Sequence, residues 1–403
     1  MKKIMVLGAI YAQVPLIEAA KRLGYHAVAA SIPGDYPGFA AADECCYVDI
    51  TDPEAVAEEA CRLQVDGVTT CGMDTGIVAM GRACDKLGLC GISQQAAAAA
   101  SNKYMSKKAF VEAGVRCADY RVVKNEADLE SALDSLGLPV AVKAVDLMGS
   151  RGIYRCDTRE EAHAAFVKVM DETRQEYCLV EEFIDGLLFG ADGMFSEGKL
   201  VFLLPFGTEA YMGGQVATPV GHWAPFEYQD MLEEIRALVT KAGNALGIQN
   251  GPFNCDLMLR DGRVYLIEIN GRPGATCIPE IISNYYGCNY YEVICRQAAG
   301  EDVSGFFRLD GRVPFASISH IIGSDRDGIL REIRNNNEMA DDICDLTFGV
   351  KTGERVSRYQ NGRDRLGQVI IKGSTLEECR RRMAEVMDNI ELVIDGGSES
   401  LGD

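Results

Sequence analysis

Residues 256–272 read DLMLRDGRVYLIEINGR, and this stretch predicts more about the chain than any other. The pair Asp261-Gly262 suits a tight turn with positive backbone angles, so we expect two antiparallel strands joined there. Side chains alternate between the two faces of a strand. One face of the hairpin is therefore polar, with Asp256, Glu268, Asn270 and Arg272. The other face is apolar and is expected to be buried, with Tyr265, Ile267 and Ile269.

The polar face is typical of a divalent cation site. Two carboxylates about 4 Å apart repel each other by about 4 kcal/mol at an effective dielectric of about 20. A hard cation between them removes this repulsion, and ligands that are all oxygen suit magnesium. We therefore predict that Asp256, Glu268 and Asn270 bind the metal, and that Arg272 neutralises a phosphoryl group beside it. The alternative is an exposed hairpin edge with solvated charges.

The composition is that of a globular protein with two or three domains. Its 403 residues exceed one ordinary core, and 47% of them are hydrophobic and 25% charged. A net charge of −20 disfavours nucleic acid as a partner. No apolar run reaches the ~18 residues of a membrane span, and the apolar start, residues 4–7, fits a first strand better than a signal peptide. The 15 cysteines, without a Cys-x-x-Cys pair, indicate reduced thiols in a cytoplasmic protein.

The order of predicted strands and helices divides the chain into three domains of α/β and α+β class. Residues 1–95 alternate strand and helix, which predicts an open parallel sheet. The turn after the first strand lacks Gly-x-Gly-x-x-Gly, so a dinucleotide site is disfavoured. Residues 96–304 carry antiparallel strands, with a lid subdomain over about 117–186 and a metal-binding subdomain over 187–304. Residues 305–403 read as a small α+β domain.

Two lysines and a glycine-rich loop favour phosphate binding. Lys103 lies on a predicted helix that runs from residue 96 to about residue 114, and Lys143 lies in an apolar strand. A lysine in such a strand is costly to bury unless it meets an anion. The loop that follows can turn its amides toward phosphate oxygens, and it contains Gly149, Ser150 and Gly152. In isolation, this loop reads as a plain turn and Lys103 as a solvated helix lysine.

Further polar residues stand at strand ends and are candidate ligand contacts. Glu181 and Glu182 end an apolar strand just before Ile184, where backbone atoms suit an adenine edge and a carboxylate suits ribose hydroxyls. Asp74 follows a strand of the first domain and is a candidate substrate contact, although capping of the next helix explains it as well. His222 stands beside the single tryptophan and is a second substrate candidate, with a purely structural role as the alternative.

Taken in order, these motifs resemble the ATP-grasp family, in its carboxylate–amine ligase type, and the resemblance covers nearly the whole chain. The groups concerned are the L-amino acid ligases, phosphoribosylglycinamide synthetases and the large subunit of carbamoyl-phosphate synthase. The resemblance implies that Lys103 and Lys143 hold the α- and β-phosphates of ATP and that the loop at 149–152 covers the β- and γ-phosphates. It also implies adenine contacts from Glu181 and Ile184. The implied metal is Mg²⁺, with Mn²⁺ as the alternative.

The resemblance implies a reaction as well. A small-molecule carboxylate attacks ATP to form an acylphosphate, with Arg272 and Lys143 as catalytic residues, and an amine then displaces phosphate. A small-molecule kinase and a biotin-carboxylase-like enzyme stay as alternatives, although residues 273–276, PGAT, depart from the biotin carboxylase pattern. Leu188 stands where many members carry the ribose-binding glutamate, so Glu181 or Glu182 is expected to take that contact. The sequence leaves open which acid and amine react and whether the protein is a homodimer.

Overall fold

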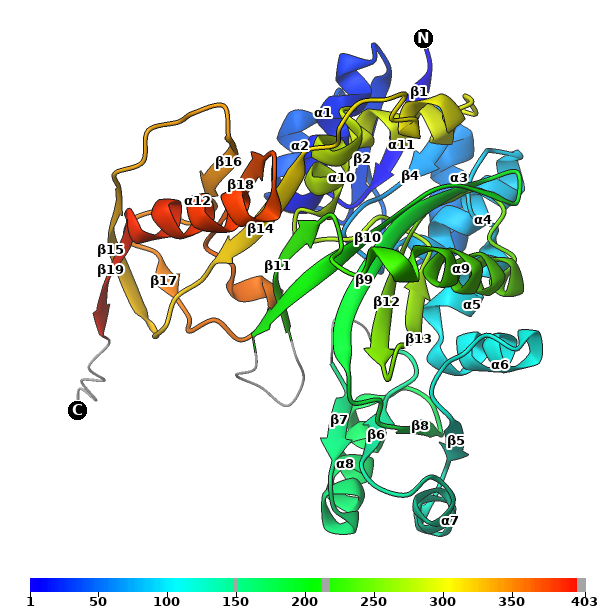
Figure 1. Ribbon diagram of the computed structural model, residues 1–403. Coiled ribbons are helices and arrows are strands. Elements are labelled where there is room, and N and C mark those ends of the chain that lie inside the picture. Colours follow the sequence, from blue (N-terminus) through cyan, green and yellow to red (C-terminus); the bar gives the residue numbers. More distant parts are fainter. Residues whose placement is uncertain (148–150, 212–217, 397–403) are drawn as a thin grey trace, which may run out of the picture. The chain divides into compact units, whose positions relative to one another are not determined.

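The structure is a computed structural model that describes residues 1–147, 151–211 and 218–396 (Figure 1). The chain divides into two compact units. Unit 1 holds residues 1–205, 228–275 and 288–308, and unit 2 holds 206–227, 276–287 and the chain from Leu309 onward. The division into three domains stays a prediction. Within the described residues, no helix is both long enough and apolar enough to cross a membrane.

An open parallel sheet begins unit 1, as predicted from the alternation of strands and helices. Its strand order is β3-β2-β1-β4. The strands are β1 (Lys3–Leu7), β2 (His26–Ser31), β3 (Glu44–Tyr47) and β4 (Gly67–Thr69). The helices between and after them are η1 (Tyr11–Gln13), α1 (Val14–Arg22), α2 (Pro37–Ala41), α3 (Pro53–Leu63) and α4 (Ile77–Leu87). Residues Ile4 to Leu7 have no exposed surface, as expected of a parallel sheet with both faces covered.

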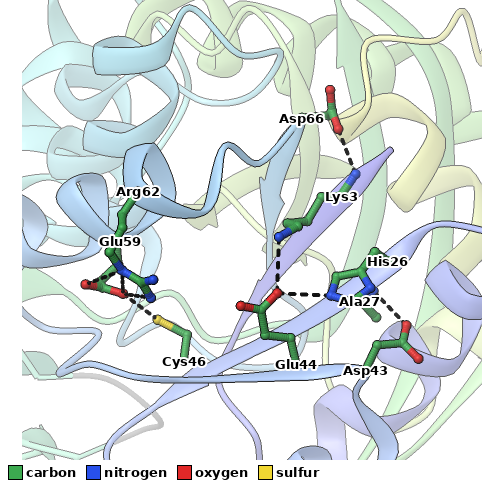
Figure 2. Close-up of polar contacts among 9 residues, drawn as sticks. All are labelled: Lys3, His26, Ala27, Asp43, Glu44, Cys46, Glu59, Arg62 and Asp66. Carbon is green, nitrogen blue, oxygen red and sulfur yellow. Dashed lines mark hydrogen bonds and ion pairs between the residues drawn. The ribbon is translucent and has the colours of Figure 1, made fainter. Parts of the chain in front are cut away.

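Polar side chains join the amino ends of these strands, as Figure 2 shows. The Glu44 carboxylate accepts from Lys3 Nζ at 3.1 Å and lies 3.0 Å from His26 Nε2. The Ala27 amide donates to Asp43 at 3.0 Å. These pairs link β1, β2 and β3 at the amino edge of the sheet, whereas Asp74 follows the carboxyl end of β4. Ligands of open sheets bind at the carboxyl edge, which is the opposite edge of this sheet.

The prediction of one helix from residue 96 to about 114 is wrong, because the helix is interrupted at Asn102. The structure has two helices there, α5 (Gln94–Ser101) and α6 (Lys103–Ala113). Asn102 has an extended backbone, and its side chain accepts from the Met105 amide, so it caps α6. The break makes Lys103 the first residue of α6.

An antiparallel sheet with two helices forms the next part of unit 1. Its strand order is β5-β8-β6-β7. The elements are β5 (Tyr120–Val123), α7 (Glu126–Leu136), β6 (Val140–Lys143), β7 (Ile153–Cys156), α8 (Arg159–Glu172) and β8 (Cys178–Glu182). Helices α7 and α8 pack their apolar faces on the sheet. The shared core contains Val142 and Val180 of the strands and Phe166 of α8. This core holds β6 and β8 as antiparallel neighbours, with Glu181 opposite Ala141 and therefore diagonal to Lys143.

The predicted hairpin at 256–272 is confirmed. It consists of β12 (Gly251–Arg260) and β13 (Arg263–Asn270), with positive φ at both Asp261 and Gly262. Strand β12 also pairs with β9 (Leu187–Ser196), and β9 is followed by β10 (Lys199–Tyr211). The remaining helices of unit 1 are η2 (Gln229–Met231), α9 (Leu232–Leu246), α11 (Tyr290–Ala298) and η3 (Ser304–Phe307).

The prediction of one buried apolar face for Tyr265, Ile267 and Ile269 is wrong, because the hairpin contains a bulge. Asp256 pairs with Glu268, whereas the next residue, Leu257, pairs with Leu266, so Ile267 is the extra residue. Val264, Leu266 and Ile269 are buried, whereas Tyr265 and Ile267 are partly exposed. The extra residue shifts the alternation by one position, and Glu268 and Asn270 still share the face of Asp256.

Unit 2 is built on two antiparallel sheets, which agrees with the predicted α+β character of this region. The larger continues from β10 through β11 (Thr218–Ala224), β14 (Ala316–Ile322), β18 (Gly367–Gly373) and β16 (Ile343–Phe348), and the smaller has the order β17-β15-β19. The strands of the smaller sheet are β15 (Gly328–Asn335), β17 (Arg355–Val356) and β19 (Ile390–Gly396), and the helices are α10 (Ile278–Tyr286), η4 (Gly362–Asp364) and α12 (Leu376–Asp388). Helix α12 lies against the larger sheet (Figure 1), and its residues Cys379, Met383 and Val386 belong to the core there.

Candidate active site

A cavity of about 600 Å³, a volume that includes open solvent, lies within unit 1. Polar and charged side chains from several elements line it: Asp74, Ser101, Lys103, Ser106, Lys107, Lys143, Glu181, Glu268 and Asn270. The cavity therefore brings together the lysines of α6 and β6 and the carboxylate side of the β12–β13 hairpin, as the order of motifs predicted.

A buried ion triad supports the lysine wall of this cavity. The Glu181 carboxylate receives Lys143 Nζ at 2.8 Å and Lys107 Nζ at 3.1 Å. Glu181 is 1% exposed and Lys107 is 2% exposed. Burial raises the pKa of Glu181, but the two ammonium groups outweigh it and bring the pKa to about 2. Two cations on one anion leave a net positive charge in the cavity wall, which suits a phosphate.

Lys103 and Gly152 are held at the ends of the predicted phosphate loop. Lys103 Nζ donates to the Leu147 carbonyl at 2.5 Å, just before that loop. The Gly152 carbonyl accepts from the Ala144 amide at 2.7 Å, and Gly152 has a φ of +62°. A Cβ on Gly152 would meet Ala144 Cβ at 2.8 Å, so glycine is required for both reasons. Gly149 and Ser150 lie outside the described residues.

The three predicted metal ligands share one face of the hairpin. Asp256 stands opposite Glu268, and the Asn270 amide donates to Glu268 Oε1 at 3.2 Å. Burial, and then the Glu268 carboxylate, raise the pKa of Asp256 well above its usual range. Among the described residues, Asp256 has no hydrogen-bond or ion-pair partner for its side chain. The Asp256 and Glu268 carboxylates therefore repel each other, as is expected at a cation site.

The oxygens of this face fit a magnesium ion that arrives with a nucleotide. Within the described residues, no three His, Cys, Asp or Glu side chains form a complete metal site. Magnesium commonly takes one or two carboxylates from a protein and the rest of its ligands from phosphates and water. Asp256 and Glu268, with the Asn270 oxygen, match that pattern.

Arg272 follows the metal face and is fixed by several acceptors. Its Nε donates to Asp74 Oδ1 at 2.7 Å, and its Nη1 lies 3.2 Å from the Pro273 carbonyl and 3.5 Å from Asn254 Oδ1. Burial lowers and Asp74 raises the pKa of this guanidinium, and the net direction is upward. Arg272 is therefore a fixed cation, held by Asp74, which itself lines the cavity.

The other predicted contacts are more scattered. Ile184 is buried, and Glu182 pairs with Arg260 at 2.7 Å. The Glu181 side chain is engaged by two lysines, so its ribose contact stays a prediction, as does that of Glu182. His222 lies in unit 2, where it is buried against Phe206 and 3.2 Å from Thr208. Its role in substrate binding also stays a prediction.

Sequence reasoning missed two buried polar residues of the site. Lys107 stands four residues after Lys103, and that helical spacing is a signal that could have placed both on one face of α6. Asp192 stands alone in the apolar strand β9, where a carboxylate is costly to bury. It accepts from Asn254 Nδ2 at 2.7 Å and from the Gly274 amide at 2.8 Å, and burial raises its pKa to about 7.

Comparisons with known proteins show the family of the chain. The model of the ATP-grasp domain matches residues 136–280, and the model of L-amino acid ligase C-terminal domain 2 matches residues 320–395. A crystal structure of phosphoribosylglycinamide synthetase from Anaerococcus prevotii is 38% identical, with a TM-score of 0.85 over 98% of this chain and 100% of that chain.

More distant relatives extend the comparison. An L-amino acid ligase from Bacillus licheniformis has the same fold, with 22% identity and a TM-score of 0.82 over 98% of this chain and 99% of that one. A formate-dependent phosphoribosylglycinamide formyltransferase of Wolinella succinogenes is 25% identical over 70% of this chain and 73% of its own. The chain belongs to the ATP-grasp family of ATP-dependent carboxylate–amine ligases, as the order of its motifs predicted.

Proposed function

We propose that this protein is an ATP- and Mg²⁺-dependent ligase that joins a small-molecule carboxylate to an amine. The observation that supports it most is one cavity lined by Lys103, Lys107 and Lys143 and by Glu268 and Asn270 of the hairpin. A triphosphate needs cations along its phosphates and a divalent ion at its terminal groups. The cavity offers lysines for the phosphates, and Glu268 and Asn270 supply oxygens for such an ion.

Different side chains would bind the phosphates and the metal ion. Lys143 and Lys103 bind phosphate oxygens, and Lys107 keeps Glu181 from neutralising Lys143 completely. Asp256, Glu268 and Asn270 would hold Mg²⁺, which when bound neutralises negative charge on the transferring phosphoryl group.

Arg272 serves the carboxylate and the acylphosphate. Its Nε and Nη1 are engaged by Asp74, Asn254 and Pro273, whereas its Nη2 donates to no other described residue. In the proposed reaction, this Nη2 group donates to the substrate oxyanion. The acylphosphate forms when a carboxylate oxygen displaces ADP from the γ-phosphorus, and the amine then expels phosphate from the carbonyl carbon.

The amino acid class is the first to test as substrate. The match of residues 320–395 to an L-amino acid ligase domain supports an amino acid as one of the two reactants. The second candidate function is a kinase on the same scaffold, since the phosphate and metal side chains would serve both reactions.

A product assay separates the two functions. Purified protein is incubated with Mg²⁺-ATP and with amino acids and other small acids, singly and in pairs with amines. A ligase releases ADP and free phosphate, and mass spectrometry detects a condensed product when acid and amine are both present. A stable phosphorylated product without free phosphate would instead support the kinase.

A further inference from the structure

We infer that Asp192 and Asn254 form a relay that positions the Arg272 guanidinium toward the substrate oxyanion. Asp192 acts through these groups and is therefore a positioning residue, not a catalytic one. The inference deepens the proposed function and rests on it.

The Asp192 carboxylate uses both of its oxygens as acceptors. One oxygen accepts from Asn254 Nδ2 at 2.7 Å, and the other accepts from the Gly274 amide at 2.8 Å. Asp192 has no exposed surface, and it stands directly opposite Asn254 in the pairing of β9 with β12. The carboxylate therefore links β12 to the loop that follows Arg272.

The first bond sets the orientation of the Asn254 amide. Because Nδ2 faces Asp192, Oδ1 must face the other way, toward Arg272 Nη1 at 3.5 Å. The second bond sets the direction of the chain after Arg272, because Gly274 is two residues beyond it. With Nε held by Asp74 at 2.7 Å, the guanidinium plane is fixed on two sides.

The cost of burying Asp192 indicates a role beyond packing. Its pKa is raised because burial penalises the charged form. A neutral apolar side chain would fill this position of β9 between the buried neighbours Ala191 and Met194 at lower cost. The bonds it makes lead to the guanidinium that the proposed reaction uses.

Exchange of hydrogen-bonding partners gives a sharp test. Both partners of Asp192 are N–H donors, so Asp192→Asn places its own NH₂ against a donor whichever way the amide turns. The double variant Asp192→Asn/Asn254→Asp repairs this. The new amide at position 192 then accepts from Gly274 and donates to the new carboxylate at position 254, and that carboxylate accepts from Arg272.

The kinetics of the three proteins are compared with the best carboxylate substrate found. We expect Asp192→Asn to raise the KM for the carboxylate and to lower kcat/KM by at least tenfold, with Mg²⁺-ADP affinity within twofold of wild type. The double variant should recover most of that loss. Asp43→Asn is the matched control. Asp43 also accepts a hydrogen bond from a backbone amide, that of Ala27, but it lies at the amino edge of the N-terminal sheet (Figure 2).

Normal kinetics for Asp192→Asn, or a double variant no better than the single one, would overturn the relay. A crystal structure of each variant gives a reading that does not depend on turnover. The Arg272 guanidinium should leave the Asn254 side in Asp192→Asn and return in the double variant, and an unmoved guanidinium would also overturn the relay. Absence of turnover in the wild-type protein contradicts the proposed function instead, and the crystal structures still decide the relay.

Discussion

Substitution of Glu181 by glutamine should destabilise the protein strongly, because Glu181 is the single anion between two lysines. The fall of its pKa from 4.5 to about 2 corresponds to about 3 kcal/mol of native-state stabilisation. Removal of one member of a buried ion pair costs about 3–5 kcal/mol in comparable cases. Lys107, 2% exposed, would remain as an uncompensated buried charge. We therefore expect a loss of about 3–5 kcal/mol in the free energy of unfolding at pH 7.

Urea unfolding followed by fluorescence and far-UV circular dichroism measures this loss. The folded pKa of Glu181 lies below its ordinary value, so its contribution is present above pH 4.5 and is lost as the pH falls toward 2. The double variant Glu181→Gln/Lys107→Met removes the stranded charge and should recover much of the stability.

Glu44→Gln is the matched control, because Glu44 also has two cationic partners, Lys3 and His26, but its side chain is 34% exposed. It should cost less than about 1 kcal/mol. Equal losses for Glu181→Gln and Glu44→Gln, or a double variant less stable than Glu181→Gln, would refute this reasoning.

Three further predictions concern the nucleotide site and unit 2. Glu268→Ala should lower kcat by about a thousandfold or more with an unchanged circular dichroism spectrum, and near-normal turnover with magnesium would contradict its role as a ligand. Lys103→Met should raise the KM for ATP about tenfold or more, since a charged hydrogen bond is worth about 1.5–3 kcal/mol, and an unchanged KM would remove Lys103 from the phosphate site. Burial lowers the pKa of His222 to about 4, so stability should fall as the pH drops from 6.5 through 4, and His222→Gln should flatten this slope; an identical slope in both proteins would show that another group titrates.

The sequence was sufficient to predict the polar face of the hairpin but not the apolar one. The turn at Asp261-Gly262 depends on local backbone preference, which a sequence shows directly. The extra residue Ile267 depends on how β13 pairs with β12, and strand pairing is not a local property. Tyr265 was therefore assigned to the wrong face.

The polar groups of the site show the same difference between local signals, which a sequence contains, and contacts that only the folded chain creates. Lys143 was recognised because a charged residue interrupts an apolar strand, and Asp192 in β9 carried that same signal without being recognised. The pairing of Lys107 with Glu181 joins residues 74 positions apart, and only the folded sheet brings them together. The break at Asn102 came from a side-chain cap, which competed successfully with the helical preference of the alanine run.

The central claim is that one cavity binds nucleotide phosphates between lysines and a divalent ion. Calorimetric titration of Mg²⁺-ADP into the wild-type protein and into Lys143→Met tests it most directly, with the surface variant Lys21→Met as control. We predict saturable binding at one site per chain, weakened about tenfold or more by Lys143→Met and by omission of magnesium. Absence of binding heat, or binding that neither Lys143→Met nor removal of magnesium alters, would contradict the claim.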